Sequence, residues 1–351
     1  KELGFSEACA ISPLSNLLLG NVFERRGALS ALGHIGDARA IPSILEAFES
    51  DAIPRDVGAA LDNIGDVRGF EGLVRLLKSD TRGSGLFSHR HRVVMAMSNI
   101  NNEFKYQFVE PLIETLAEPF PEVTTEDHQA RQLALRLSVC RSYTIILLGK
   151  IGDTRAVEPL ISIVESDSDK FWDLFANKSQ YRDGARHTSI TALGEIGDKR
   201  AVGPLIRTLK DIEQGGFAHR SKWTSNAEWA VISLGKIGDR QATIPLIKLL
   251  ETTMSGSVAT ALGRIGDNQS VEPLIMALKN DSKEVRSKVA EALGEINDKR
   301  ATGPLISALQ RPENDEEDES LSSLPTRHGL KKEETVSVKT SIPSATGCVQ
   351  E

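Results

Sequence analysis

Apolar residues recur along most of the chain at the spacing of one buried helical face, in two alternating phrases. In the phrase TRAVEPLISIV, the residues Val157, Leu160, Ile161 and Val164 follow the i, i+3, i+4, i+7 pattern of a helix that packs on one side. We call this predicted element helix A. The second phrase, EVRSKVAEALGEI, predicts helix B and has its own apolar stripe at Val285, Val289, Ala292, Leu293 and Ile296.

A hexad of the form Leu-Gly-x-Ile-Gly-Asp ends most copies of helix B. Leucine and isoleucine complete the apolar stripe, glycine suits the left-handed backbone at a helix C-terminus, and aspartate can cap the next helix. In five copies a proline six residues after the aspartate predicts that helix A begins a few residues later or bends there. Copies of the hexad occupy residues 32–37, 61–66, 148–153, 193–198, 234–239, 262–267 and 293–298, with a degenerate copy at 97–102.

This pattern gives eight two-helix units, followed by a ninth helix A near residues 301–310. One unit cannot bury its own stripe, so neighbouring units must stack around a continuous core. The sequence therefore predicts an all-α, right-handed α-solenoid over residues 1–310. Residues 311–351 are acidic and rich in Ser and Thr without an apolar period, and we expect a disordered tail there.

The central units are longer than the others. Successive corner residues, from Asp37 to Asp298, lie 29, 36, 51, 45, 41, 28 and 31 residues apart. Matching the two helices places most of the extra residues between helix A and helix B, so the insertions should emerge from one edge; a short extension ahead of VEPLIETL is the exception. In the fourth unit we expect one long helix B over residues 124–151, with Thr124 and Asp127 in a capping box, or a shorter helix after an extended loop.

The insertions hold most of the side chains that suit recognition. Only 5% of the chain is aromatic, yet all three tryptophans and five of the seven histidines fall in or just after the insertions. We predict a binding edge here, although any single aromatic residue could instead anchor its loop by packing. The candidate binding residues are Phe87, His89, Phe171, Trp172, Phe175, Tyr181, Arg182, Asp183, Arg186, His187, Phe217, His219, Arg220, Trp223, Glu228 and Trp229.

Two insertions share the pattern Gly-x-Phe-Ser/Ala-His-Arg, at residues 85–90 and 215–220. Arg90 lies ten residues before the isoleucine of its hexad, so we interpret it as a structural residue of the repeat, whereas Arg220 lies outside that register. The same helix B position is occupied by Arg25, Arg141, Arg186 and Arg286. His89 and His91 could ligate a metal, but a site needs three or four ligands, so we expect a solvated HRHR surface and no metal.

Composition and charge narrow the function classes. No apolar run approaches the roughly 20 residues of a membrane span, which indicates a soluble protein without a membrane partner. The net charge of −7 lies largely in the tail, and a nearly neutral body argues against nucleic acid as a partner. Three widely spaced cysteines and no recognisable signal peptide favour a cytoplasmic location.

The repeat phrases IGDxRAVEPLIxxL and VRxxAAxALGxI resemble the HEAT-like repeat of phycobilisome (bilin) lyases over nearly the whole predicted solenoid. The resemblance implies the fold but no single activity, because such repeats also serve a hydroxylase, scaffolds and adaptors. Deoxyhypusine hydroxylase binds di-iron through His-Glu pairs, and no histidine of this chain precedes a glutamate. The chain also has no Walker loop, GxSxG or HExxH motif.

We therefore expect a non-catalytic scaffold or adaptor that binds a protein or peptide through the insertions and needs no cofactor. The alternative is a bilin lyase or bilin-binding chaperone, which attaches a tetrapyrrole to a cysteine of a phycobiliprotein. A bilin site needs aromatic walls, cations for the propionates and a carboxylate near the pyrrole nitrogens. The insertions offer Trp172, Phe175, Trp223 and Trp229 as walls, Arg182, Arg186, His219 and Arg220 as cations, and Asp173, Asp183 or Glu228 as carboxylates.

Overall fold

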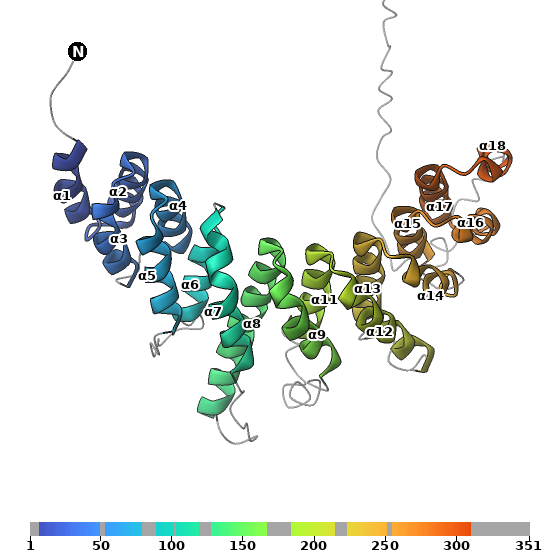
Figure 1. Ribbon diagram of the computed structural model, residues 1–351, viewed down its shortest axis with the longest axis horizontal. Coiled ribbons are helices and arrows are strands. Elements are labelled where there is room, and N and C mark those ends of the chain that lie inside the picture. The colour runs from blue at the N-terminus through green and yellow to red at the C-terminus, as the bar shows by residue number, and fades with distance from the viewer. Residues whose placement is uncertain are drawn as a thin grey trace, which may run out of the picture. The chain divides into compact units, whose positions relative to one another are not determined.

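The structure, a computed structural model, describes residues 7–49, 53–78, 89–101, 103–118, 128–166, 184–214, 223–250 and 255–309. The chain divides into two units after Leu309, and all of the described residues belong to the first unit. In this part of the chain the regular structure is helical throughout, which confirms the all-α solenoid (Figure 1). The predicted tail lies outside the described residues.

The helices alternate between two rows in chain order. The helix A row consists of α1 (Glu7–Leu17), α3 (Ile41–Glu49), α5 (Val67–Lys78), α7 (Val109–Ala117), α9 (Val157–Glu165), α12 (Val202–Gln214), α14 (Thr243–Ile247), α16 (Val271–Ala277) and α18 (Thr302–Leu309). The helix B row consists of α2 (Val22–Ile35), α4 (Pro54–Ile64), α6 (His89–Met97), α8 (His128–Ile151), α11 (Gly184–Ile196), α13 (Trp223–Ile237), α15 (Ser255–Ile265) and α17 (Lys283–Ile296). Consecutive B helices pack directly against each other, as Figure 1 shows.

The corner between units forms as the hexad predicts. Gly152 follows α8 with a φ of 76°, and its N–H donates to Leu148 O at 3.1 Å. The Asp153 carboxylate then accepts the backbone N–H of Arg155 at 2.9 Å, which caps the 3-10 turn η3 (Thr154–Ala156). Helix α9 begins after that turn, two residues before Pro159, so helix A starts after the corner and does not bend at the proline.

Other corners repeat this geometry with small changes. Gly36, Gly65, Gly197, Gly238 and Gly266 adopt the same left-handed backbone. At the last corner Asn297 replaces glycine with a φ of 56° and donates its N–H to Leu293 O. Short 3-10 turns precede helix A at η1 (Ala38–Ala40), η5 (Lys199–Ala201), η7 (Arg240–Ala242), η8 (Asn268–Ser270) and η9 (Lys299–Ala301).

Corner arginines tie one unit to the preceding one. Arg200 holds Asp198 with two hydrogen bonds of 3.1 and 2.8 Å, and it also reaches Thr154 O at 3.0 Å and the Glu158 carboxylate at 3.4 Å. Two other corners make the same cross-unit bridge, through Arg155 to Glu110 and through Arg300 to Glu272. In α12, Gly203 replaces that glutamate, and the next corner has Gln241 in place of the arginine. In α14, Ile244 replaces the glutamate, and the next corner has Gln269 in place of the arginine.

A second set of arginines caps the carboxyl end of helix A. Arg25 donates to Gly20 O at 2.9 Å, Arg286 donates to Asn280 O at 2.9 Å, and Arg141 donates to Leu116 O. Arg90, at the same helix B position, forms an ion pair with Glu118 at 2.5 Å, just after α7. The interpretation of Arg90 as a structural residue is confirmed.

The long segments lie where the repeat analysis put them. Residues 79–88, 119–127, 167–183 and 215–222 separate a helix A from its helix B and lie outside the described residues. The extension ahead of VEPLIETL forms the 3-10 helix η2 (Glu103–Phe108). Helix α8 has 24 residues, which confirms a long helix B, while its predicted capping residues fall outside the described part.

One hydrophobic core runs from Ile11 to Ala301 through the described units. Neighbouring B helices approach closely because glycine occupies the second hexad position. A methyl group added at Gly194 would lie 2.7 Å from Ser233 Cβ, and one added at Gly235 would lie 2.8 Å from Ala261 Cα. Gly294, at the same position in α17, has nothing within 4 Å of such a methyl group.

We expect Gly194→Ala to destabilise the protein by about 1–3 kcal/mol, because α13 must shift away from α11 to admit the methyl group. The matched control is Gly294→Ala, which should be neutral or stabilise by up to about 1 kcal/mol, since alanine favours a helix over glycine. Urea unfolding followed by far-ultraviolet circular dichroism measures both changes. Equal effects of the two substitutions would contradict the close packing of the B helices.

The corner aspartates predict a loss of stability in acid. Hydrogen bonds from Arg39, Arg68 and Arg300, first through the side chain and then through the backbone N–H, lower the pKa of each preceding aspartate to about 2. Because the folded-state pKa lies below the ordinary value of 3.8, this stabilisation is present above about pH 4 and is lost as the pH falls towards 2. The three carboxylates are those of Asp37, Asp66 and Asp298.

The triple variant Asp37→Asn, Asp66→Asn, Asp298→Asn should therefore show a smaller fall in melting temperature between pH 4 and pH 2 than the parent protein. Differential scanning calorimetry at a series of pH values measures the slope. Glu71→Gln, a change at an exposed residue of α5, is the control and should leave the slope unchanged. Parallel curves for the triple variant and the parent would contradict the assignment.

Candidate functional site

Five of the candidate binding residues have described side chains: His89, Arg186, His187, Glu228 and Trp229. Trp223 is described only as the first residue of α13. The other candidates lie outside the described residues, namely Phe87, Phe171, Trp172, Phe175, Tyr181, Arg182, Asp183, Phe217, His219 and Arg220. The geometry of the site therefore comes from the starts of α6, α11 and α13.

His187 and Trp229 meet across the contact between α11 and α13. Their ring centroids lie 4.7 Å apart at an interplanar angle of 79°, an edge-to-face arrangement. Further along the same contact, Ser233 Oγ donates to Ile190 O at 2.9 Å and fixes the register of the two helices. Trp229 is half-buried and packs against the hydrophobic core, with the His187 ring edge-to-face against its own.

The pair lies close to the points where two insertions rejoin the fold. Helix α11 begins at Gly184, directly after residues 167–183, and α13 begins at Trp223, directly after residues 215–222. A half-buried arginine, Arg186, precedes His187 and occupies the register of the arginines that cap helix A elsewhere. Aromatic, imidazole and guanidinium groups are thus placed next to the sequence that was predicted to bind.

Polar groups lie on both sides of α13, towards α15 and towards α11. Glu228 is exposed and accepts a hydrogen bond of 3.3 Å from Ser257 Oγ on α15. Ser189 Oγ on α11 and Asn226 Oδ1 on α13 are buried, and neither has a hydrogen-bond partner in the structure. Buried polar atoms are usually hydrogen-bonded. These two unpaired atoms therefore distinguish the contact between α11 and α13 from the apolar contacts around it.

His89 does not join this pair. It lies on α6, half-buried, with its ring 5.7 Å from that of Phe48, and burial together with the Arg92 charge lowers its pKa. His91 is 3% exposed and packs edge-on against Tyr143 with the ring centroids 4.2 Å apart; burial lowers its pKa as well. The expectation of a solvated HRHR surface is wrong, because these residues begin α6 and turn both imidazoles into the packing.

Tyr143 was not among the predicted site residues, although its place in the repeat gives a signal. Tyr143 lies eight residues before the hexad isoleucine Ile151, and Trp229 lies eight residues before Ile237. Their histidine partners also share one register, nine residues before Ile100 for His91 and before Ile196 for His187. An alignment of the units on the hexad would have paired the four residues.

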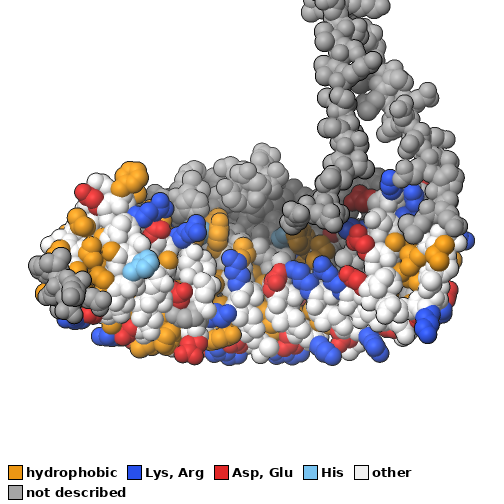
Figure 2. Space-filling view, turned by 90° about the horizontal axis from the view of Figure 1, so that it is seen from above, with side chains coloured by type: hydrophobic (Ala, Val, Ile, Leu, Met, Phe, Trp, Pro, Cys, Tyr) orange, Lys and Arg blue, Asp and Glu red, His pale blue; other side chains and the backbone are white. Residues whose placement is uncertain are grey.

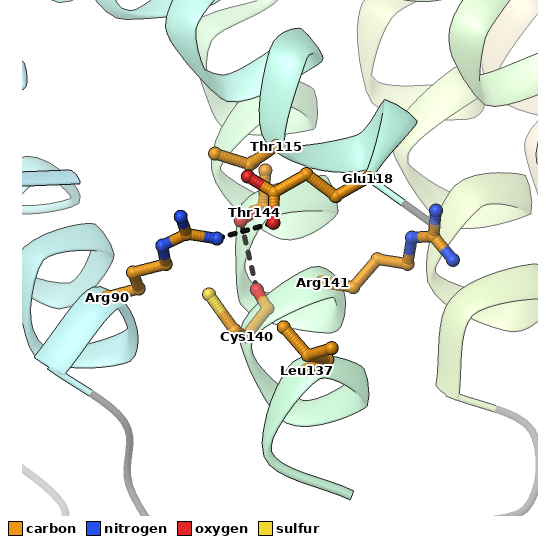
Figure 3. A pocket seen from close by; sticks show the side chains of 7 residues that line it. All are labelled: Arg90, Thr115, Glu118, Leu137, Cys140, Arg141 and Thr144. Atoms are coloured by element: carbon orange, nitrogen blue, oxygen red, sulfur yellow. Dashed lines mark hydrogen bonds and ion pairs between the residues drawn. The ribbon is translucent and has the colours of Figure 1, made fainter. Parts of the chain in front are cut away.

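A small hollow lies between α6, α7 and α8, lined by Arg90, Thr115, Glu118, Leu137, Cys140, Arg141 and Thr144. In Figure 3 the Arg90 and Glu118 side chains point toward each other across its mouth. Thr144 Oγ1 donates to Cys140 O at 2.9 Å within α8. Arg90, Glu118 and Thr144 thus form ion pairs or hydrogen bonds with other residues of this chain. The residues that line the hollow hold neighbouring units together.

Among the described residues, no group of three or more His, Cys, Asp or Glu side chains could hold a metal ion. Within the same residues, no helix combines the length and apolar character of a membrane span.

Two repeat families match the chain. The PBS lyase HEAT-like repeat matches residues 24–50, 185–211 and 227–252, and the HEAT repeats family matches residues 254–324. The second and third of these segments contain His187 and Trp229, respectively. No curated protein sequence matches the chain.

Solved structures of low identity also align with it. The complex of CpcE and CpcF of phycocyanin lyase from Nostoc is 24% identical, covering 54% of this chain and 71% of that one, with a TM-score of 0.38. Human deoxyhypusine hydroxylase is 19% identical, covering 83% of this chain and 96% of that one, with a TM-score of 0.32. An engineered protein is 18% identical, covering 82% of this chain and 96% of that one, with a TM-score of 0.30.

The recurring glycine and aspartate corners, the two rows of helices and the matched repeat models agree with one another. The fold is an α-solenoid of HEAT-like repeats, in which residues 24–50, 185–211 and 227–252 match the PBS lyase HEAT-like repeat.

Proposed function

We propose that this protein is a non-catalytic interaction scaffold that binds a protein partner at the edge formed by its central insertions. The observation that carries the proposal is the His187–Trp229 pair at the joins of two insertions. Tryptophan and arginine are the residues that most often dominate protein–protein binding energy, and a ring held by a neighbour loses little freedom on binding. The repeat stack supplies the rigid support that such an edge needs.

Capture of a partner by the full-length protein tests the scaffold. The double variant Trp172→Ala, Trp223→Ala should lose a protein that the parent captures from extracts of the cells that make it, because the insertion aromatics form the binding edge. The captured protein is identified by mass spectrometry, and circular dichroism checks that helicity is unchanged. Met276→Ala, at an exposed residue of α16, is the control and should retain the partner.

The scaffold proposal fails if the double variant and the control capture the same proteins in the same amounts. It also fails if the parent protein captures none beyond those bound by an unrelated helical protein.

A bilin lyase or bilin-binding chaperone is the second candidate. It is favoured by the match of the PBS lyase HEAT-like repeat to the two segments that contain His187 and Trp229. A tetrapyrrole would need aromatic surface, a cation for its propionates and a carboxylate near its pyrrole nitrogens. Trp229, Arg186 and Glu228 are groups of these three kinds at the starts of α11 and α13.

Titration with phycocyanobilin separates the two candidates. The scaffold proposal expects an unchanged visible spectrum at micromolar bilin, because an edge that binds a protein partner holds no chromophore. A red-shifted spectrum that saturates at one bilin per chain, with quenched tryptophan fluorescence, would replace the scaffold with the lyase. Trp229→Phe should then weaken the quenching without changing helicity.

A further inference from the structure

Helix α6 begins with two histidines that contact the neighbouring units. His89 is half-buried, with its ring 5.7 Å from that of Phe48 near the end of α3. His91 is 3% exposed, with its ring 4.2 Å from that of Tyr143 on α8. Figure 1 shows α6 between α4 and α8, against both of which it packs. An imidazole can gain a charge near neutral pH, so the contacts of α6 with the units on both sides depend on a titratable group.

A proton on His89 would meet a cation that is already in place. Arg92 lies over the Phe48 ring, with its guanidinium carbon 5.0 Å from the ring centroid, and it donates to Phe48 O at 3.0 Å. His89 and Arg92 thus contact the same ring. The Nε2 atom of His89 is buried and has no hydrogen-bond partner among the described residues. Because a protonated imidazole donates from both nitrogens, protonation would add a like charge beside Arg92 and leave a buried donor without an acceptor.

The folded protein favours the neutral form of both rings. Burial lowers the pKa of His91 below the ordinary value of 6.5, and burial followed by the Arg92 charge lowers the pKa of His89. Glu49 of α3 raises the pKa of His89, but its effect is weaker than that of Arg92. Since the folded-state pKa values lie below the ordinary one, protonation destabilises the folded start of α6 as the pH falls below about 6.5.

The carboxylates of α4 and α7 at this end of the stack are already held by cations. They form three ion pairs: Asp56 with Arg26 at 3.0 Å, Glu114 with Lys78 at 2.6 Å and Glu118 with Arg90 at 2.5 Å. The further charged or titratable residues at this end of the packed elements are Glu46 and Glu49 of α3, Arg55 of α4, Arg75 of α5, and Cys140, Arg141 and Tyr143 of α8. A charge on either histidine would therefore compete with arginine and lysine for the acidic groups.

The histidine pair is a local feature of α6. Helix α11 has His187 at the register of His91, but Ala185 and Thr188 replace His89 and Arg92 there. Figure 2 shows cationic and acidic side chains interspersed along one face of the stack, with no broad region of a single sign. Protonation should therefore act on the units that α6 joins and leave the rest of the stack unchanged.

We propose that the start of α6 is an acid-sensitive joint, which holds α3, α6 and α8 together while His89 and His91 are neutral and loosens when they are protonated. This property goes beyond the scaffold role and needs no bound partner. Helix α6 begins directly after residues 79–88, one of the central insertions, so the joint lies next to the proposed binding edge. Its pH window also lies above the range of about pH 4 to 2 in which the corner aspartates act.

Nuclear magnetic resonance of the full-length protein, with carbon-13 at histidine Cε1, tests the titration directly. The chain has seven histidines, and the signals of His89 and His91 are those that disappear in His89→Phe and His91→Phe. Both signals should titrate with midpoints below 6.5 in the parent protein. A midpoint at or above 6.5 for either ring would overturn the proposal.

Hydrogen–deuterium exchange at about pH 7.5 and pH 5.5, corrected for the intrinsic exchange rates, measures the loosening. Protection of peptides from α6 and from residues 137–144 of α8 should fall about tenfold or more at the lower pH, since one unit of pKa shift changes an equilibrium tenfold. Peptides from α15, further along the stack, should keep their protection. Equal protection of α6 at the two pH values would contradict the joint.

The double variant His89→Phe, His91→Phe keeps a ring at both positions and removes both titratable groups, so its α6 should be equally protected at the two pH values. His34→Phe, at an exposed residue of α2, is the matched control and should lose protection of α6 in acid as the parent does. If the double variant already exchanges faster at pH 7.5, the single variant His91→Phe takes its place and should retain part of the loss. The proposal is also overturned if the histidine variants lose as much protection as the control.

Discussion

Everything in this stack depends on the corner that joins a helix B to the next helix A. A glycine in the left-handed region ends helix B, and the carboxylate of the aspartate directly after it accepts the backbone N–H two residues further on. The corner fixes the angle between consecutive helices, and the apolar stripes of neighbouring units meet as a result. Corner arginines also donate hydrogen bonds to the preceding unit, so these corners help to fix how one unit is aligned with the next.

The fold was predictable because its signals are local and repeated. The hexad, the proline near the start of helix A and the i, i+3, i+4 stripe each recur at fixed spacing, and every copy strengthens the others. The long helix α8 was predictable for the same reason, since apolar periodicity continues upstream of its hexad. Even the replacement of glycine by Asn297 at the last corner follows from the tolerance of asparagine for left-handed backbone.

The candidate site was less predictable, because its contacts join different helices. His187 and Trp229 were chosen individually for their residue types, but their ring contact depends on how α11 and α13 are set side by side. The prediction that the HRHR stretch is exposed to solvent was wrong for a related reason. A charged sequence suggests exposure, whereas the ring contact of His91 with Tyr143 comes from a neighbouring helix. The insertions have no repeat pattern, so their residues cannot be aligned from unit to unit. The sequence therefore identifies side chains that suit binding but does not predict where they lie.

The placement of the insertions between helix A and helix B also has a consequence for how such a protein changes over generations. The corners and cross-unit bridges of the described residues involve the hexad, the 3-10 turn that follows it and helix A. A longer turn adds a loop-closure cost that grows only with the logarithm of its length. Duplication of a unit followed by rewriting of its turn can therefore alter recognition while the inherited stack stays as it was.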